Sequence, residues 1–204
     1  MISRLKNENA ESLISLKEWE ENMKALTIYD SLGGNTEKVA SRIHQVLCST
    51  GIESDLIKVG SGSNMEFLDY DIIFIGSPVV NWLPTPSMMK FVENKFREYR
   101  KSGRLPSSVP LRPGKFGVCF CTYGGPHIGK NEAVPLTKWF RAFLEHLGYL
   151  VLDEWYTIGE FHGKLEMSTK GRMGDTRGRP NEKDLKDIEI LVNGVLSSLA
   201  AWLS

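Results

Sequence analysis

The chain alternates short runs of apolar residues with longer stretches in which apolar residues recur every three or four positions. Short apolar runs predict β-strands, and the longer spacing predicts amphipathic helices. The predicted strands are residues 25–29, 52–59, 71–76, 116–122 and 149–155. The predicted helices are residues 37–49, 87–99, 133–147 and 182–203. Strands that alternate with helices specify an α/β fold with a parallel sheet and right-handed crossovers.

Residues 1–24 precede this pattern and are mostly polar and charged. We interpret them as an N-terminal extension in which residues 12–23 form a short amphipathic helix. Residues 25–204 then form a single domain, because a chain of 204 residues is close to the roughly 150 residues typical of one domain. The N-terminus lacks the apolar core of a secretory signal, and no apolar run approaches the ~18 residues of a membrane span. We therefore expect a cytoplasmic protein with no membrane partner.

Charge and cysteine usage exclude several functional classes. Lys plus Arg number 25 and Asp plus Glu number 25, a balance that argues against a nucleic-acid partner. Cys48, Cys119 and Cys121 show no metal-ligand or redox spacing. Cys119 and Cys121 lie two apart in an apolar strand, so we expect both thiols on one buried face. The sequence thus predicts no metal site.

Three turn-rich loops each follow a predicted strand directly, and a parallel sheet brings all three to the same edge. The first loop, residues 31–36, has two glycines that let the backbone approach a ligand closely. Asn35 or Thr36 can cap the following helix, whose free N–H groups and positive dipole end bind phosphate. No Lys follows the glycines, so a phosphate monoester fits better than a triphosphate. A tight turn with no ligand is the alternative interpretation.

The second and third loops each carry an aromatic residue. The second loop, residues 76–86, is stiffened by three prolines and places Asn81 and Trp82 beside exposed backbone. In the third loop, residues 122–127, Tyr123 precedes two glycines. Trp82 and Tyr123 either stack on a flat ring or pack into the protein. Together with the first loop, these two loops predict a site for a flat heterocycle with a phosphate tail.

The motif Ser31-Leu32-Gly33-Gly34-Asn35-Thr36 resembles the phosphate loop of flavodoxins, with Gly33 in place of the usual threonine. Residues 71–78 and 122–125 are similar to the strand and loops that hold the isoalloxazine ring in that superfamily. The likeness to the flavodoxin-like superfamily extends over about residues 25–200. It implies a doubly wound, five-stranded parallel sheet of order 2-1-3-4-5 in three αβα layers.

The resemblance also implies noncovalently bound FMN, with the chemistry carried by the flavin rather than by a catalytic side chain. The implied cofactor-binding residues lie in the three loops: Ser31, Gly33, Gly34, Asn35, Thr36, Pro78, Val79, Val80, Asn81, Trp82, Thr122, Tyr123, Gly124 and Gly125. His127 and His162 are secondary candidates for proton transfer.

A basic segment, residues 163–183, holds six Lys and Arg residues against three acidic residues. We interpret its glycines and hydroxyl residues as a mobile flap after the last strand. Such a flap could bind the phosphates of NAD(P)H or an acidic partner protein. A solvated surface loop is the alternative.

The sequence therefore predicts an FMN-binding oxidoreductase that passes electrons from NAD(P)H or a redox partner to a quinone, a flavin or a small organic acceptor. The alternatives are a non-enzymatic electron carrier and, third, a flavin-free interaction module. Homo-oligomerisation stays open, because Trp139, Trp155 and Trp202 suit either a core or an interface.

Overall fold

The computed structural model describes residues 23–60 and 65–203. Its strands form one sheet of order β2-β1-β3-β4-β5, in which all four pairings are parallel. The strands are β1 (Lys24–Tyr29), β2 (Glu53–Lys58), β3 (Ile72–Pro78), β4 (Phe116–Tyr123) and β5 (Leu150–Ile158). The predicted fold class and strand order are confirmed.

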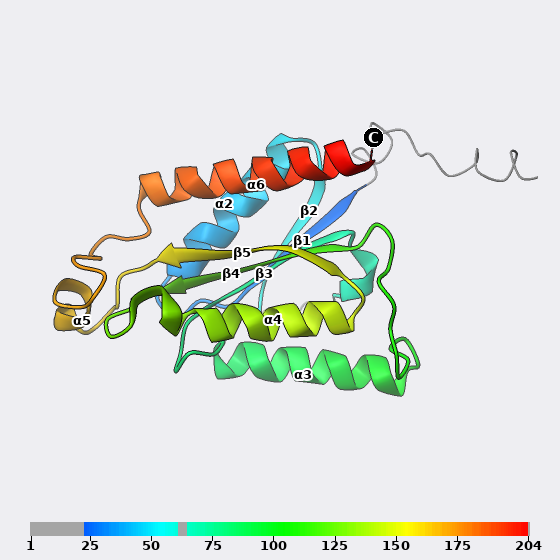
Figure 1. Ribbon diagram of the computed structural model, residues 1–204, viewed down its shortest axis with the longest axis horizontal. Helices are drawn as coiled ribbons and strands as arrows, with labels where there is room; N and C mark the ends of the chain where they lie inside the picture. The colour runs from blue at the N-terminus through cyan, green and yellow to red at the C-terminus, as the bar shows by residue number, and fades with distance from the viewer. Residues whose placement is uncertain (1–22, 61–64, 204) are drawn as a thin grey trace, which may run out of the picture.

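In the described part of the chain, four long helices cover the two faces of the sheet. They are α2 (Asn35–Ser49), α3 (Pro86–Lys101), α4 (Val134–His146) and α6 (Glu182–Leu203), and a short helix, α5 (Leu165–Thr169), lies between β5 and α6. Helices α2 and α6 lie against one face, and α3 and α4 against the other (Figure 1). This arrangement is the three-layer architecture that the resemblance implies.

The strand residues alternate between two hydrophobic cores, one on each face of the sheet. In β1, Leu26 and Ile28 belong to the core under α3 and α4, while Ala25 and Tyr29 belong to the core under α2 and α6. Side chains alternate because successive strand residues point to opposite faces. Cys119 and Cys121 are both buried in the first of these cores, as predicted.

The observed elements differ from the predicted ones mainly at strand ends. Strands β3, β4 and β5 run on to Pro78, Tyr123 and Ile158, because parallel pairing continues past the last apolar residue of each run. At the other end, Met23 is buried and Lys24 begins β1, so these residues belong to the folded domain rather than to the extension. The rest of the helix predicted at residues 12–23 lies outside the described residues.

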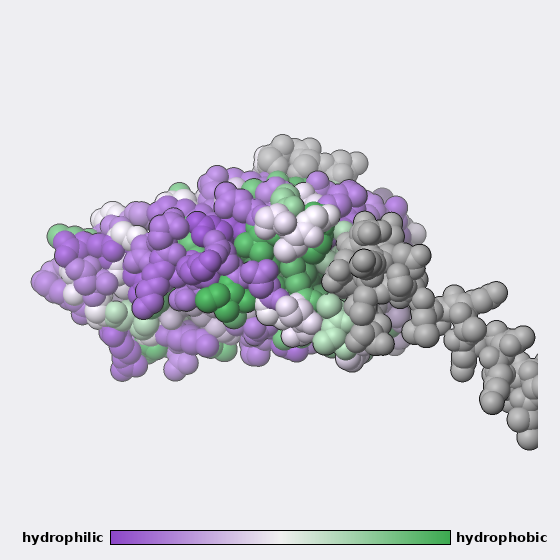
Figure 2. Space-filling model, turned by 90° about the horizontal axis from the view of Figure 1, so that it is seen from above, coloured by the Kyte–Doolittle hydropathy of each residue, from purple (hydrophilic) through white to green (hydrophobic). Residues whose placement is uncertain are grey.

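The outer side of α6 carries both polar and apolar residues. Viewed from above, hydrophilic side chains dominate the α5 end of the molecule, and hydrophobic ones are visible over its middle (Figure 2). On α6, Ile190 is 61% exposed and Trp202 is 67% exposed, although the Trp202 ring also meets Phe116 edge to face. Trp155 is buried in the core. Oligomerisation stays a prediction, and of these two tryptophans only Trp202 is exposed enough to contribute to an interface.

A carboxylate on the edge strand β5 joins that strand to α4. The Glu154 side chain is 9% exposed and accepts hydrogen bonds from Thr137, Lys138, Arg141 and Tyr156. Burial opposes its ionisation, but the bonds from Lys138, Tyr156, Arg141 and Thr137 outweigh that effect and lower its pKa from 4.5 to about 2.

This network predicts a loss of stability in acid that depends on Glu154. Because the pKa is lower in the folded state, the carboxylate stabilises the protein above pH 4.5, and that contribution is lost as the pH falls toward 2. Its full size is up to about 3 kcal/mol. Urea unfolding at a series of pH values should show a shallower acid slope for Glu154→Gln than for the native chain. Equal slopes in this window would contradict the assignment.

Candidate functional site

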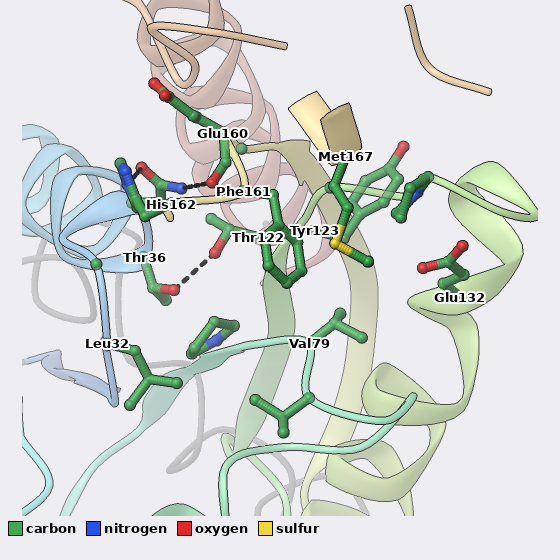
Figure 3. A pocket seen from close by; sticks show the side chains of 18 of the residues that line it. Leu32, Thr36, Val79, Thr122, Tyr123, Glu132, Glu160, Phe161, His162 and Met167 are labelled. Carbon is green, nitrogen blue, oxygen red and sulfur yellow. Dashed lines mark hydrogen bonds between the residues drawn. The ribbon is translucent and has the colours of Figure 1, made fainter. Parts of the chain in front are cut away.

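A cavity of about 690 Å³ opens at the carboxyl edge of the sheet. Its walls come from the first, second and third loops and from the β5–α6 segment, residues 159–181 (Figure 3). Strand order reverses direction at β1 and β3 in this sheet, and ligands of doubly wound folds bind at such a switch point. Every residue predicted to bind the cofactor lines this cavity except Gly34.

In the first loop, the predicted helix cap is wrong. Helix α2 begins at Asn35, its N-cap is Gly34, and neither Asn35 nor Thr36 caps it. Ser31 takes that role from outside the helix, because its Oγ accepts the backbone N–H groups of Gly34 and Glu37 at 3.1 and 3.3 Å. Asn35 and Thr36 already lie in the first helical turn, which frees their side chains for contacts across the cavity.

Those contacts tie the first loop to its neighbours. The Thr36 and Thr122 hydroxyls lie 2.7 Å apart (Figure 3), and the Asn35 amide donates to the Glu160 carbonyl at 2.9 Å. Within residues 23–60 and 65–203, the backbone N–H groups of Gly33, Asn35 and Thr36 donate no hydrogen bond. These N–H groups are therefore available to an anion at the helix N-terminus.

A buried carboxylate, missed by the sequence reasoning, connects the first two loops. Asp30 is 6% exposed and accepts the backbone N–H of Ser31 at 2.7 Å. Its other oxygen accepts the Thr85 hydroxyl at 2.5 Å and the Ser87 hydroxyl. Thr85 in turn caps α3, since its Oγ1 accepts Met88 N–H. The sequence signal was an acidic residue directly after an apolar strand.

The second loop turns tightly around Asn81 and Trp82. Val80 and Leu83 exchange two backbone hydrogen bonds of 2.9 and 3.0 Å, and φ is 49° at Asn81 and 67° at Trp82. Two consecutive positive φ values define a type I′ turn, which is strained at a tryptophan. The Trp82 side chain is 58% exposed. Backbone strain of this kind gathers at ligand sites.

The third loop presents its backbone to the cavity more than its aromatic ring. Tyr123 is 6% exposed, and burial raises the pKa of its hydroxyl. Most of the ring is therefore covered, which weakens the expected stacking role. Beside it, the Glu132 carboxylate accepts the backbone N–H groups of His127 and Ile128 and fixes the turn that carries His127.

The β5–α6 segment is folded onto the sheet edge, and its role as a mobile flap stays a prediction. Gly159 N–H donates to Tyr123 O and Arg172 N–H to Pro126 O, each at 2.9 Å. Phe161 points into the cavity and is 37% exposed (Figure 3). Eight residues outside the predicted set and the two histidine candidates also line the cavity: Leu32, Pro126, Glu132, Gly159, Glu160, Phe161, Lys164 and Met167.

Three of the six cations of the basic segment form ion pairs within the segment or with α6. Lys170 pairs with Glu166, Arg177 with Asp175, and Arg179 with Asp184. Of the remaining three cations, only Lys164 lines the cavity, and it makes no ion pair in the described part of the chain. A nicotinamide phosphate would therefore meet fewer free cations than the composition suggests.

Residues 23–60 and 65–203 show neither a membrane span nor a metal centre. No helix there is both long enough and apolar enough to cross a membrane. No group of three or more His, Cys, Asp or Glu side chains in that part of the chain could hold a metal ion.

Comparisons with known proteins agree with this geometry. Residues 26–104 match the family model described as a flavodoxin domain. The uncharacterized protein MJ0732 of Methanocaldococcus jannaschii is 28% identical over 145 residues, or 67% of this chain. The match covers 32% of that protein, so the chain spans about a third of the length of this curated relative.

Solved structures share the fold at low sequence identity. A flavodoxin from the domain Archaea superposes with a TM-score of 0.58 at 19% identity, covering 86% of this chain and 98% of that one. The rubredoxin oxygen:oxidoreductase of Desulfovibrio gigas has a TM-score of 0.58 at 17% identity, covering 92% of this chain and 39% of that one. The sheet order and these structural likenesses show that the chain has a flavodoxin-like fold, and residues 26–104 are similar to a flavodoxin domain.

Proposed function

We propose that the protein binds FMN in the 690 Å³ cavity and acts as an FMN-dependent oxidoreductase. The observation that carries the proposal is the convergence of three loops and the β5–α6 segment on one cavity at the switch point of the sheet. The volume falls in the range of about 300–1,000 Å³ that is usual for small-molecule sites.

The first loop fits a phosphate monoester. The backbone N–H groups of Gly33, Asn35 and Thr36 are free of internal acceptors in the described residues, and they lie at the positive end of α2. Ser31 and Thr36 add hydroxyl groups that also line the cavity. No lysine or arginine lies in this loop, so backbone donors would carry most of the phosphate contact.

The remaining walls fit a flat ring. Trp82, 58% exposed on the second loop, and Phe161, 37% exposed on the β5–α6 segment, are the two most exposed aromatic side chains of the cavity. Gly124 and Gly125 present backbone to the same space. When bound, FMN would supply one- and two-electron redox chemistry, while the chain holds the ring and excludes water from it.

Electrons would arrive from NAD(P)H or a redox protein and leave to a quinone, a flavin or another small organic acceptor. The D. gigas relative carries the name of an oxidoreductase, which supports an enzyme. An electron carrier is the second candidate, because two exposed apolar side chains suit a docking protein: Leu32 lines the cavity and is 72% exposed, and Leu83 lies on the second loop and is 37% exposed. Reduction of the bound flavin by NADH or NADPH separates the two candidates.

The first experiment is direct. The purified protein should bind FMN stoichiometrically, with quenched flavin fluorescence and a shifted visible spectrum, and should then oxidise NADPH or NADH when a quinone is added. Tight FMN binding with no reduction by either nicotinamide would leave the electron carrier. Absence of FMN binding at micromolar protein would contradict both and leave a flavin-free interaction module.

A further inference from the structure

Gly33 is a glycine because of space, not because of backbone conformation. Its φ lies outside the left-handed region, so the conformation admits any residue. A Cβ built on Gly33 would instead lie 2.3 Å from Cδ2 and 3.1 Å from Nε2 of His162. The imidazole of a residue more than a hundred positions away thus occupies the place of the side chain that Gly33 lacks.

A second glycine, Gly159 in the β5–α6 segment, makes room for a side chain of the first loop in the same way. A Cβ on Gly159 would lie 2.7 Å from the amide nitrogen of Asn35. Asn35 can therefore contact two residues of the β5–α6 segment. Its amide nitrogen donates to Glu160 O at 2.9 Å, and its Oδ1 lies 3.2 Å from His162 Nε2. The close packing of the β5–α6 segment on the first loop depends on both glycines.

The His162 ring faces the first loop, and the nearby carboxylates have other partners. The Glu160 carboxylate accepts Gly178 N–H, and Glu37 on α2 pairs with Lys58. Lys164 is the nearest cation in sequence and also lines the cavity. The bond from Nε2 to Asn35, at 3.2 Å, is at the long end of the normal range, so its N–H can be shared with a further acceptor.

We infer that His162 is a phosphate-binding residue whose imidazole N–H takes the place of the side-chain hydroxyl that Gly33 cannot provide. The inference rests on the proposed function and concerns the phosphate end of the site, not the ring. It differs from the proton-transfer role, which stays a prediction for His162 and His127. The chemical group recognised is a phosphate monoester, and the same donor would also meet inorganic phosphate.

The test compares ligands that differ only in the phosphate. Dissociation constants for FMN and riboflavin are measured by flavin fluorescence quenching. The proteins compared are the native chain, His162→Ala and His162→Gln. In a third arm, inorganic phosphate is added to the riboflavin titrations. Loss of a hydrogen bond to a charged group should weaken FMN binding about tenfold to a hundredfold in His162→Ala. Riboflavin binding without phosphate should hardly change, and His162→Gln, which keeps an N–H donor, should retain most of the FMN affinity.

A double variant supplies the rescue. In the double variant, His162→Ala makes room for Gly33→Thr, which places a hydroxyl on the loop, so the affinity for FMN should recover. Gly33→Thr alone collides with the His162 imidazole and should weaken FMN binding. Equal losses for FMN and riboflavin in His162→Ala, or no loss for either, would overturn the inference and leave the proposed function intact. Failure of the native chain to bind either flavin would overturn the proposed function as well.

Discussion

Replacement of Gly34 by valine is expected to weaken FMN binding at least about tenfold. Gly34 has φ 88° and ψ −13°, the left-handed conformation, and a Cβ there would meet nothing within 4 Å. The damage therefore comes from the backbone, since a β-branched residue in this region costs about 1–3 kcal/mol. Gly34 does not line the cavity, but Gly33 and Asn35 on either side do. A shift that relieves the strain moves their N–H groups away from the phosphate.

Gly51 offers a matched control at the other end of the same helix. It has φ 85° and equally open surroundings, and it lies beyond the 15 residues of α2, about 22 Å from Gly34. Gly51→Val should therefore lower the free energy of unfolding by a similar amount and leave the dissociation constant of FMN unchanged. Asn, which tolerates this conformation better, should give an intermediate result at position 34. Equal affinities in the two valine variants would show that the first loop does not hold the ligand.

The sequence predicted the sheet well because burial leaves a direct trace in the pattern. Strand β3, buried on both faces, reads as a continuous apolar run, as a central parallel strand should. Parallel topology then brings the loops after β1, β3 and β4 to one edge. The convergence of the predicted site residues on a single cavity follows from this topology, although their contact with a cofactor stays a prediction.

The parts that the sequence did not predict depend on contacts between distant residues. The glycines and charges of the β5–α6 segment look the same whether it is solvated or folded, and only the structure shows that Gly159 makes room for Asn35. The predicted cap of α2 was wrong for a similar reason, because Ser31 accepts the N–H groups of the helix start from a position outside the helix. Phe161 follows an unremarkable strand end, and nothing local distinguishes it from a core aromatic residue.

Asp30 is expected to be the residue on which the relative positions of the first two loops depend most. Its carboxylate joins Ser31 N–H of the first loop to the hydroxyls of Thr85 and Ser87 at the start of α3. Asp30→Ala removes a buried acceptor from three donors, which should lower the free energy of unfolding by about 3 kcal/mol. FMN affinity should fall about tenfold or more, since both loops must be in place before the ligand binds.

Asp71 separates the effect on the site from the effect on stability. It also joins two elements through its carboxylate, accepting Lys24 N–H and the Lys115 ammonium, but it precedes β3 at the opposite edge of the sheet. Asp71→Ala should therefore destabilise the protein without changing the FMN dissociation constant of the folded fraction. Asp30→Asn keeps an oxygen for Ser31 N–H, so it should bind FMN nearly as well as the native chain. If Asp30→Ala and Asp71→Ala weaken FMN binding equally, general destabilisation accounts for the loss, and the two loops are not held in register by Asp30.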